Sequence, residues 1–211
     1  MIVHSMIEAE FQKEIQLDFL DAFRFSDRKD QWFRRQIIKS RQFPVRRCLP
    51  YTSPRKNKWL ILFEARSKKE HGDMSRINFV CYVDSPHGYY AFMPSFMNEI
   101  FHLVIYPPHF FSRFSLRCGV NLTGVKLMTY FFERNCSYVY DLKNKRISED
   151  AYEQEVYGST LDGVALGIAT ELDNILFRTF ITYEMTKGEQ VEKFANNEQI
   201  RKEIHEGEKK K

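Results

Sequence analysis

The sequence predicts an α+β fold with a mainly antiparallel sheet, a packed helix pair and a basic helical N-terminal module. Apolar residues recur at helical spacing early in the chain, whereas the middle and the last third hold short apolar runs bounded by charge, Pro and Gly. Hydrophobic residues make up 43% of the 211 positions and aromatic residues 15%. That content is enough to bury a substantial core.

The first elements expected are two helices and an extended segment. Apolar positions over 6–25 follow the period of a helix. A second helix is expected from Asp30, which has a residue type that commonly caps helices. Pro44, Pro50 and Pro54 then interrupt the chain and indicate a basic, extended connector.

Strands are expected after this connector. The short apolar run 58–65 is typical of a buried strand, and the runs 78–83 and 89–93 flank a segment whose Pro and Gly suit a hairpin loop. Residues 101–106 form either another strand or the approach to the next helix. Two further strands are expected over 156–170 and 175–183.

A helix pair is expected between these two groups of strands. Pro107 and Pro108 are tolerated in a first helical turn, and Gly119 is a residue type that ends helices. A second helix is expected over 122–134. Tight turns are expected at 161–163 and at Asp173-Asn174, and a charged amphipathic helix from Lys187 onward. The domain boundaries that follow are a basic module 1–57, an α+β core 58–190 and a C-terminal helix with a frayed tail 191–211.

Composition and motifs exclude several classes. No window approaches 18 consecutive apolar residues, so no membrane-spanning helix is expected. Four widely spaced Cys form no C-x-x-C pair, which favours a reducing, cytoplasmic setting without disulfides and argues against a zinc site. P-loop and dinucleotide-binding glycine motifs are lacking, so no cofactor is expected. His71 and Asp73 have no obvious third ligand nearby in sequence, so no metal is expected either.

Charge is concentrated in residues 24–58. Twelve Lys and Arg oppose only Asp27 and Asp30 there, so this segment carries +10 and the remainder of a chain of net charge +4 carries −6. Such asymmetry indicates a polyanionic partner, RNA or another nucleic acid, with interleaved aromatic residues available for base stacking. Two other readings stay open, a solvated helix face or pairing with the acidic remainder. The candidate binding residues are Arg28, Arg34, Arg35, Arg41, Arg46, Arg47, Arg55 and Lys56.

A second candidate group lies on the first helix of the expected pair. His109, Arg113 and Arg117 are spaced i, i+4 and i+8 and therefore share one side of that helix. An imidazole in the first turn of a helix, His109, suits the role of a general base, and the two guanidiniums suit a phosphate. Alternatively, the three side chains form ion pairs that anchor the helix to the sheet.

The stretch HFFSRFSLRCGVNLTGVKLMTYFFERN, residues 109–135, resembles the RelE-like and barnase/colicin-like (BECR) ribonuclease toxins of bacteria and their mobile-element relatives. The likeness continues over 162–182 and covers about 80 residues. It implies metal-independent RNA cleavage, with His109 taking the 2′-OH proton and Arg113 and Arg117 stabilising the phosphate. Arg178, Thr179 or Tyr183 would then orient the phosphate or serve the leaving group.

We therefore expect an RNA-binding protein of a toxin, phage or defence system, with endoribonuclease activity as an open question. The alternative is a non-enzymatic interaction module, such as a phage or plasmid accessory protein, that docks a polyanionic or protein partner through residues 24–58. A protein inhibitor is a further possible partner, and no membrane partner is expected.

Overall fold

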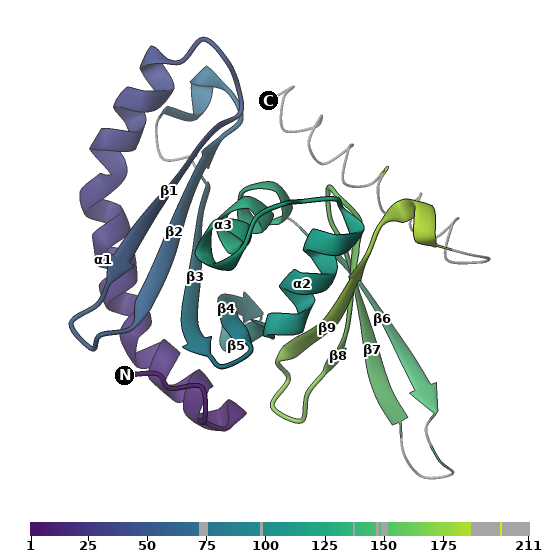
Figure 1. The fold of residues 1–211 in the computed structure, drawn as a ribbon. Helices are drawn as coiled ribbons and strands as arrows, with labels where there is room; N and C mark the ends of the chain where they lie inside the picture. Colours follow the sequence, from purple (N-terminus) through teal and green to yellow (C-terminus); the bar gives the residue numbers. More distant parts are fainter. Residues whose placement is uncertain are drawn as a thin grey trace. The chain divides into compact units, whose positions relative to one another are not determined.

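The computed structural model describes residues 1–71, 76–97, 99–136, 138–146, 148, 152–186 and 199. The chain divides into two compact units, Met1–Ile105 and Tyr106–Lys211, which are described one at a time (Figure 1). The described residues contain three α-helices and nine strands, and the predicted α+β class is therefore confirmed. None of the helices in this described part is long and apolar enough to cross a membrane.

The first unit combines one long helix with five strands. The strands follow the order β1-β2-β3-β4-β5, and the pairs β1–β2, β2–β3 and β3–β4 are antiparallel. The elements are α1 (Glu8–Lys39), β1 (Val45–Thr52), β2 (Lys58–Ala65), the 3-10 helix η1 (Lys68–His71), β3 (Arg76–Ser85), β4 (Gly88–Met97) and β5 (Ile100–Tyr106).

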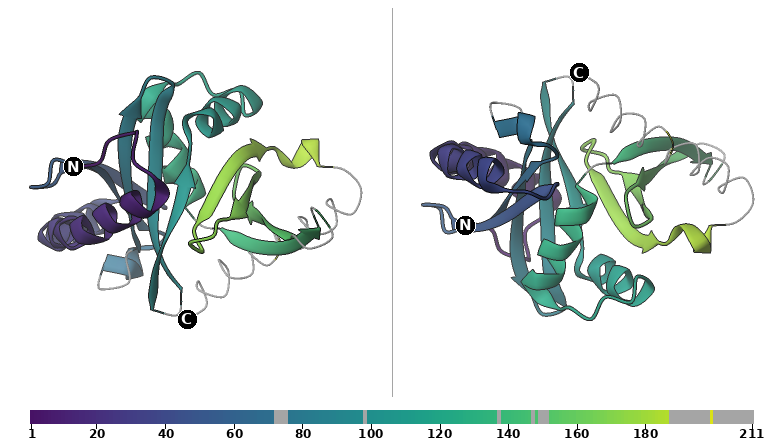
Figure 2. Two further views of the ribbon diagram at one scale, coloured as in Figure 1. Left: turned by 90° about the horizontal axis from the view of Figure 1, so that it is seen from below. Right: turned by 90° about the horizontal axis from the view of Figure 1, so that it is seen from above.

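Helix α1 covers one face of these strands (Figure 2). Alternate residues of β2 point toward it, because side chains of a strand alternate between its two faces. Phe63 contacts Phe33 at 5.2 Å between ring centroids, and Trp59 reaches the carboxylate of Asp18. The apolar stripe of α1 and the odd-numbered residues of β2 thus form the part of the core that lies between the helix and the strands.

Two expectations for the N-terminal region were wrong. Residues 8–39 form a single helix, and Asp30 lies in its interior, where its carboxylate pairs with Arg34 one turn later at 2.7 Å. No Gly or Pro interrupts this stretch, so nothing ends the helix before Lys39. The segment that was expected to be a connector instead forms the edge strand β1. Pro50 is tolerated there because some backbone N–H groups of an edge strand have no partner strand to bond to.

The second unit contains a helix pair and four strands. The strands follow the order β9-β8-β7-β6 and are antiparallel to their neighbours. The elements are α2 (Pro108–Arg117), α3 (Gly124–Asn135), β6 (Val139–Arg146), β7 (Tyr152–Ser159), β8 (Val164–Ala169), β9 (Ile175–Ile181) and the 3-10 helix η2 (Tyr183–Met185).

Phenylalanine rings from α2, α3 and β9 form the core of this unit. The Phe114 and Phe131 rings lie 4.9 Å apart and those of Phe114 and Phe180 5.1 Å apart, both edge to face. This geometry is favourable for aromatic pairs beyond the area that they bury. The packing fixes α2 against β9.

The helix pair and the strands β2, β3, β4 and β9 confirm predicted elements. Residues 101–106 belong to strand β5, which is one of the two alternatives expected for them, and the stretch 156–170 is divided between β7 and β8 around the expected turn 161–163. Gly119 follows α2 with φ +63°, and the Val120 N–H donates to the Ser115 carbonyl, which is a Schellman ending. Strand β6 was not predicted, because most of its residues are exposed and polar and so no apolar run marks it. The expected C-terminal helix lies outside the described residues apart from Gln199.

The expected domain boundaries differ from the observed units. The segment 1–57 is not a separate module, since α1 packs on β2 and β1 pairs with β2 along its length. The division falls between Ile105 and Tyr106 instead. The expected boundary after residue 190 lies outside the described residues.

Candidate nucleic-acid interface

The second unit brings part of the predicted catalytic group together. Helix α2 begins at Pro108, so His109 lies in its first turn, and Arg113 and Arg117 follow at one-turn intervals. Both His109 and Arg113 are exposed, and Arg117 is half-buried. The buried residues of α2 are all apolar and face the core of the unit, so the cationic residues lie at the border of that core.

Both arginines contact the main chain of β9. A nitrogen of Arg117 donates to the Thr179 hydroxyl at 3.0 Å and to the Phe180 carbonyl. A nitrogen of Arg113 donates to the Arg178 carbonyl at 3.3 Å. These contacts anchor α2 to β9, as the alternative reading of the sequence expects, but they use carbonyl oxygens and a hydroxyl rather than carboxylates. Each guanidinium carries five N–H donors, and these contacts use only some of them.

The other predicted catalytic residues point elsewhere. The side chain of Arg178 forms an ion pair with Glu153 of β7 at 3.3 Å. The Tyr183 hydroxyl donates to the Thr160 carbonyl at 2.5 Å, at the turn between β7 and β8. His109 makes no hydrogen bond or ion pair with any other residue in the described ranges. The structure therefore groups Arg113, Arg117 and Thr179, and leaves His109 and Tyr183 apart from that contact.

Tyr183 lines a separate cavity of about 310 Å³ in the second unit. Its wall includes Arg134, whose guanidinium binds both carboxylate oxygens of Asp162 at 2.6 and 2.9 Å. Burial, together with the charge of Asp162, raises the pKa of the Cys118 thiol there to about 11. A thiol with such a pKa is protonated at neutral pH and is a poor nucleophile.

Several of the predicted nucleic-acid-binding cations of the first unit are paired with carboxylates. Arg34 binds Asp30 at 2.7 Å, Arg46 binds Glu64 at 2.9 Å, and Arg55 binds Glu14 at 2.6 Å. Arg47 donates to the Arg46 carbonyl, and Arg28 hydrogen-bonds the Tyr51 side chain. The ion pairs of Arg34, Arg46 and Arg55 thus partly neutralise the positive charge of this segment within the unit.

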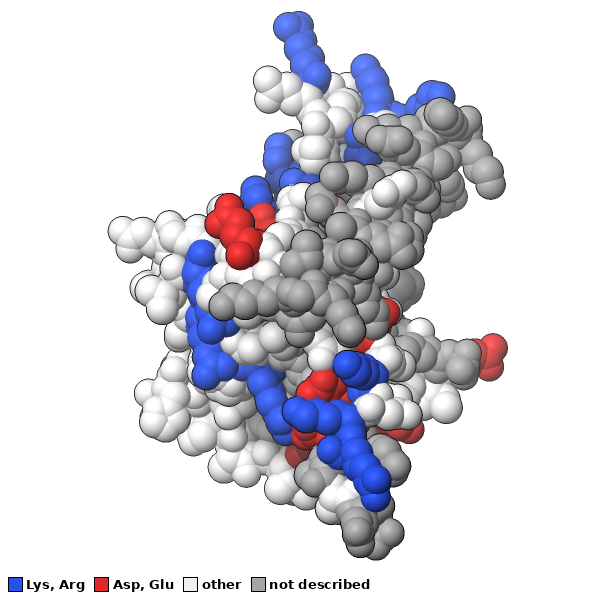
Figure 3. All heavy atoms as spheres, turned by 90° about the vertical axis from the view of Figure 1, so that its right-hand side faces the viewer, with Lys and Arg blue, Asp and Glu red and all other residues white. Residues whose placement is uncertain are grey.

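Five exposed cations gather where α1 ends. The register Val45–Ala65 places the turn 40–44 beside the segment after β2, and η1 packs against α1. At the top of Figure 3, where Figure 1 places this end of α1, Lys and Arg side chains project close together. We call this group the cationic end; its members are Arg35, Lys39, Arg41, Lys68 and Lys69, all exposed.

The carboxylates nearest to this group in sequence are already engaged. The Glu70 side chain accepts a hydrogen bond from the Arg66 N–H, and Glu64 binds the Arg46 and Arg66 guanidiniums. Arg35, Lys39, Arg41 and Lys69 form no ion pair with a carboxylate among the described residues. Sequence reasoning missed Lys68 and Lys69, although the run RSKKEH just after an apolar strand carries the signal.

The aromatic residues of the basic segment are mainly packed inside the unit. Phe25 stacks on Tyr51 with ring centroids 4.4 Å apart, and Trp32 contacts Phe63 edge to face. Phe33 is fully buried. These rings therefore pack against neighbouring side chains, and they do not support the expected base-stacking surface.

Within the residues that the structure describes, no group of three or more His, Cys, Asp or Glu side chains could hold a metal ion. Comparisons with protein-family models, with curated proteins and with solved structures found no match. The resemblance to the ribonuclease toxins consequently stays a prediction that rests on the residues themselves.

Proposed function

We propose that the protein binds RNA through the cationic end of the first unit. The observation that carries this proposal is the gathering of five exposed Lys and Arg side chains from α1, the turn after it and η1. Such a group neutralises phosphates and releases their condensed counterions, which supplies free energy for binding. An alternating arrangement of cations and carboxylates would have no comparable effect.

Binding of this kind is expected to depend weakly on base sequence. Contacts to phosphates position a nucleic acid without identifying its bases, and the neighbouring rings are packed against one another. Four phosphate contacts correspond to a slope of about −3 in a plot of log affinity against log salt for a single strand. On this proposal the RNA is held through its backbone charge rather than through its bases.

The test is fluorescence anisotropy with a labelled single-stranded RNA of mixed sequence between 50 and 200 mM salt. The triple variant Arg35→Gln/Lys39→Gln/Arg41→Gln should bind at least tenfold more weakly and show a shallower salt slope. The matched control is Lys13→Gln/Lys126→Gln/Lys143→Gln, which removes the same charge from exposed lysines outside the cationic end. Equal losses in both triple variants, or binding that ignores salt, would reject the proposal.

A second function, RNA cleavage, is favoured by one specific observation. The His109 imidazole and the Arg113 guanidinium are both exposed and one helical turn apart, so a bound phosphodiester could contact both. His109 would then take the 2′-OH proton while Arg113 stabilises the developing charge. His109→Ala should lower RNA cleavage by about 10²- to 10⁴-fold without loss of the fold. A parent protein that binds RNA but leaves it intact would make the protein a binding module, which is the alternative inferred from the sequence.

A further inference from the structure

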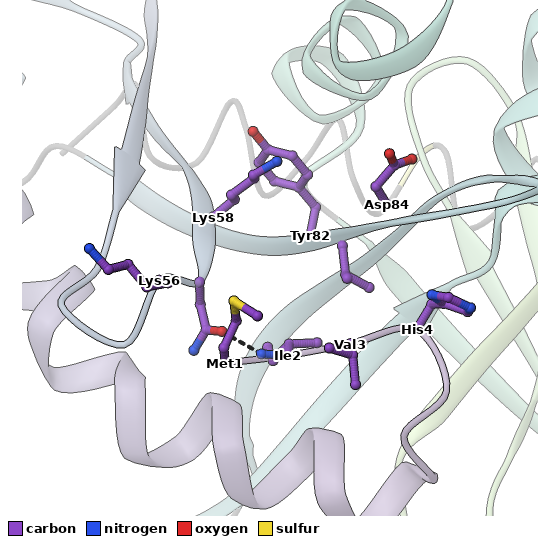
Figure 4. Close-up of a pocket in the computed structure, with 10 residues that line it drawn as sticks. Met1, Ile2, Val3, His4, Lys56, Lys58, Tyr82 and Asp84 are labelled. Carbon is purple, nitrogen blue, oxygen red and sulfur yellow. Dashed lines mark hydrogen bonds between the residues drawn. The ribbon is translucent and has the colours of Figure 1, made fainter.

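The strands of the first unit and its N-terminal segment cover only parts of α1. The buried residues of the helix face the strands, which lie on one side of it (Figure 2). Along one flank the Met1 ammonium binds Glu14 at 2.8 Å, and Figure 4 shows the N-terminal segment passing beside the helix, with the Ile2 N–H bonded to the Asn57 side chain. The residues that point away from these contacts form an outer side of α1, which is exposed.

Large apolar side chains occupy the middle of this outer side. Leu17, Leu20 and Phe23 are 56%, 53% and 45% exposed, and their spacing of three residues makes them neighbours on the helix surface. The Phe19 ring lies 6.5 Å from that of Phe23 and 5.6 Å from that of Phe96, which belongs to β4 and is 57% exposed. Single exposed apolar residues are ordinary, but a continuous apolar area of this kind is typical of an interaction surface.

Two opposite charges stand at equal distances from the centre of this apolar group. Lys13 and Asp27 lie seven residues before and after Leu20, which is about 10 Å along the helix axis in each direction. Seven residues are close to two turns, so all three side chains share one side of α1. Both charged side chains are exposed, and neither forms an ion pair with another residue of the described chain.

We propose that two copies of the chain associate through this outer side of α1, with the two helices antiparallel and Leu20 at the two-fold axis. In such a pair, residues equally far before and after Leu20 lie opposite each other. Lys13 of each copy therefore meets Asp27 of the other, and Leu17 meets Phe23. A two-fold axis makes the same surface serve both copies, so each of these contacts forms twice.

The arrangement of charge favours a second copy as the partner. A two-fold interface requires a surface that is complementary to itself, and reversal of α1 exchanges the positions of Lys13 and Asp27. A parallel pair would instead place Lys13 against Lys13 and Asp27 against Asp27, which is repulsive. Arg24, a further cation near the centre, lies opposite Gln16 of the second copy, whose amide oxygen can accept a hydrogen bond from the guanidinium.

The interface is small and its ion pairs are exposed, so the association is weak. We expect a dissociation constant on the order of 100 µM, which leaves the protein monomeric in RNA titrations at low micromolar concentration. The surface is separate from the proposed RNA site, since the cationic end begins at Arg35, two turns beyond Asp27. Either proposal can therefore fail while the other holds.

The first test is sedimentation equilibrium of the full chain between about 10 µM and 1 mM, since association depends on concentration. The parent should show a monomer–dimer equilibrium, and Leu20→Lys should raise the dissociation constant at least tenfold, because it places two lysines at the two-fold axis. The matched control is Leu116→Lys, the same change at a residue of α2 that is 82% exposed, and it should associate like the parent. A parent that is monomeric at every concentration, or equal association of Leu20→Lys and the parent, would overturn the proposal.

Charge reversal tests the antiparallel arrangement. Lys13→Glu and Asp27→Lys should each weaken the dimer at least fivefold, because each places like charges opposite each other at both ends of the interface. The double variant Lys13→Glu/Asp27→Lys exchanges the two charges and should restore the dissociation constant of the parent to within about twofold. Circular dichroism checks that each variant keeps the fold. A double variant that associates as weakly as the single variants would overturn the antiparallel pairing.

Discussion

Arg117 of α2 donates a 3.0 Å hydrogen bond to the hydroxyl of Thr179 in β9. The same guanidinium nitrogen also reaches the Phe180 carbonyl, so one side chain connects the end of a helix to a strand. The neighbouring Arg113 is more exposed and makes a single, longer contact of 3.3 Å. The two arginines lie one helical turn apart on α2, but Arg117 makes two contacts with β9 and Arg113 makes one.

Arg117→Met should consequently destabilise the protein more than Arg113→Met does. Loss of Arg117 leaves a half-buried carbonyl and hydroxyl without their donor, which costs about 1–3 kcal/mol. Arg113→Met should cost less than about 0.5 kcal/mol, as is usual for exposed positions. Urea unfolding at pH 7 measures both. Equal costs would show that the Arg117 contacts do not stabilise the packing of α2 on β9.

The sequence allowed most elements of this fold to be predicted, because strong local signals mark them. An apolar run identified β2 to the residue, and Pro107, Pro108 and Gly119 marked both ends of α2. Strand β6 was missed because an exposed edge strand needs no apolar residues. Asp30 was misread as a cap because its role, an ion pair one turn along the helix, is equally local and uses the same residue type.

The candidate sites could be predicted less completely. The spacing of His109, Arg113 and Arg117 placed them on one side of α2, but it could not show that β9 carbonyls accept from two of them. In the basic segment, Arg55 pairs with Glu14 from 41 residues earlier, a contact that depends on the tertiary fold. Only the structure could therefore show which cations of this segment are paired with carboxylates and which are exposed.

A second prediction concerns Asp18, a fully buried carboxylate of α1. One of its oxygens accepts hydrogen bonds from the Trp59 indole at 2.7 Å and from the Asn57 amide at 3.1 Å. Asp18→Ala should cost about 3 kcal/mol, since it leaves two buried donors without an acceptor. Asp18→Asn keeps an acceptor oxygen and should cost less. Chemical denaturation of both variants tests this order, and a reversed order would contradict it.

A third prediction is the pH dependence that Glu14 contributes. The hydrogen bond from the Arg55 guanidinium, with further donors in the N-terminal ammonium and Asn57, lowers the pKa of Glu14 from 4.5 to about 2. A lowered pKa in the folded state means that the ionised carboxylate stabilises the protein above pH 4.5, and that this contribution is lost as the pH falls toward 2.

The comparison of the parent protein with Glu14→Gln tests this assignment. At pH 7 the parent should have the higher free energy of unfolding, and the difference should shrink progressively between pH 4.5 and pH 2. Asp27→Asn, at an exposed position of α1, serves as the control and should give a difference that is small at every pH. A gap for Glu14→Gln that stays constant through this range would contradict the assignment to Glu14.

The last prediction contrasts two glycines of the second unit. Both have positive φ, +155° at Gly163 and +63° at Gly119, so a side chain strains the backbone at either position. Their surroundings differ, because a Cβ at Gly163 would lie 2.1 Å from the Ile181 carbonyl oxygen, whereas a Cβ at Gly119 has nothing within 4 Å. Gly119→Ala should therefore cost about 1 kcal/mol. Gly163→Ala should cost more than about 3 kcal/mol, since β8 and β9 must separate locally to admit the methyl group. Thermal unfolding of the two variants measures the contrast, and equal costs would mean that β8 and β9 do not approach each other this closely at Gly163.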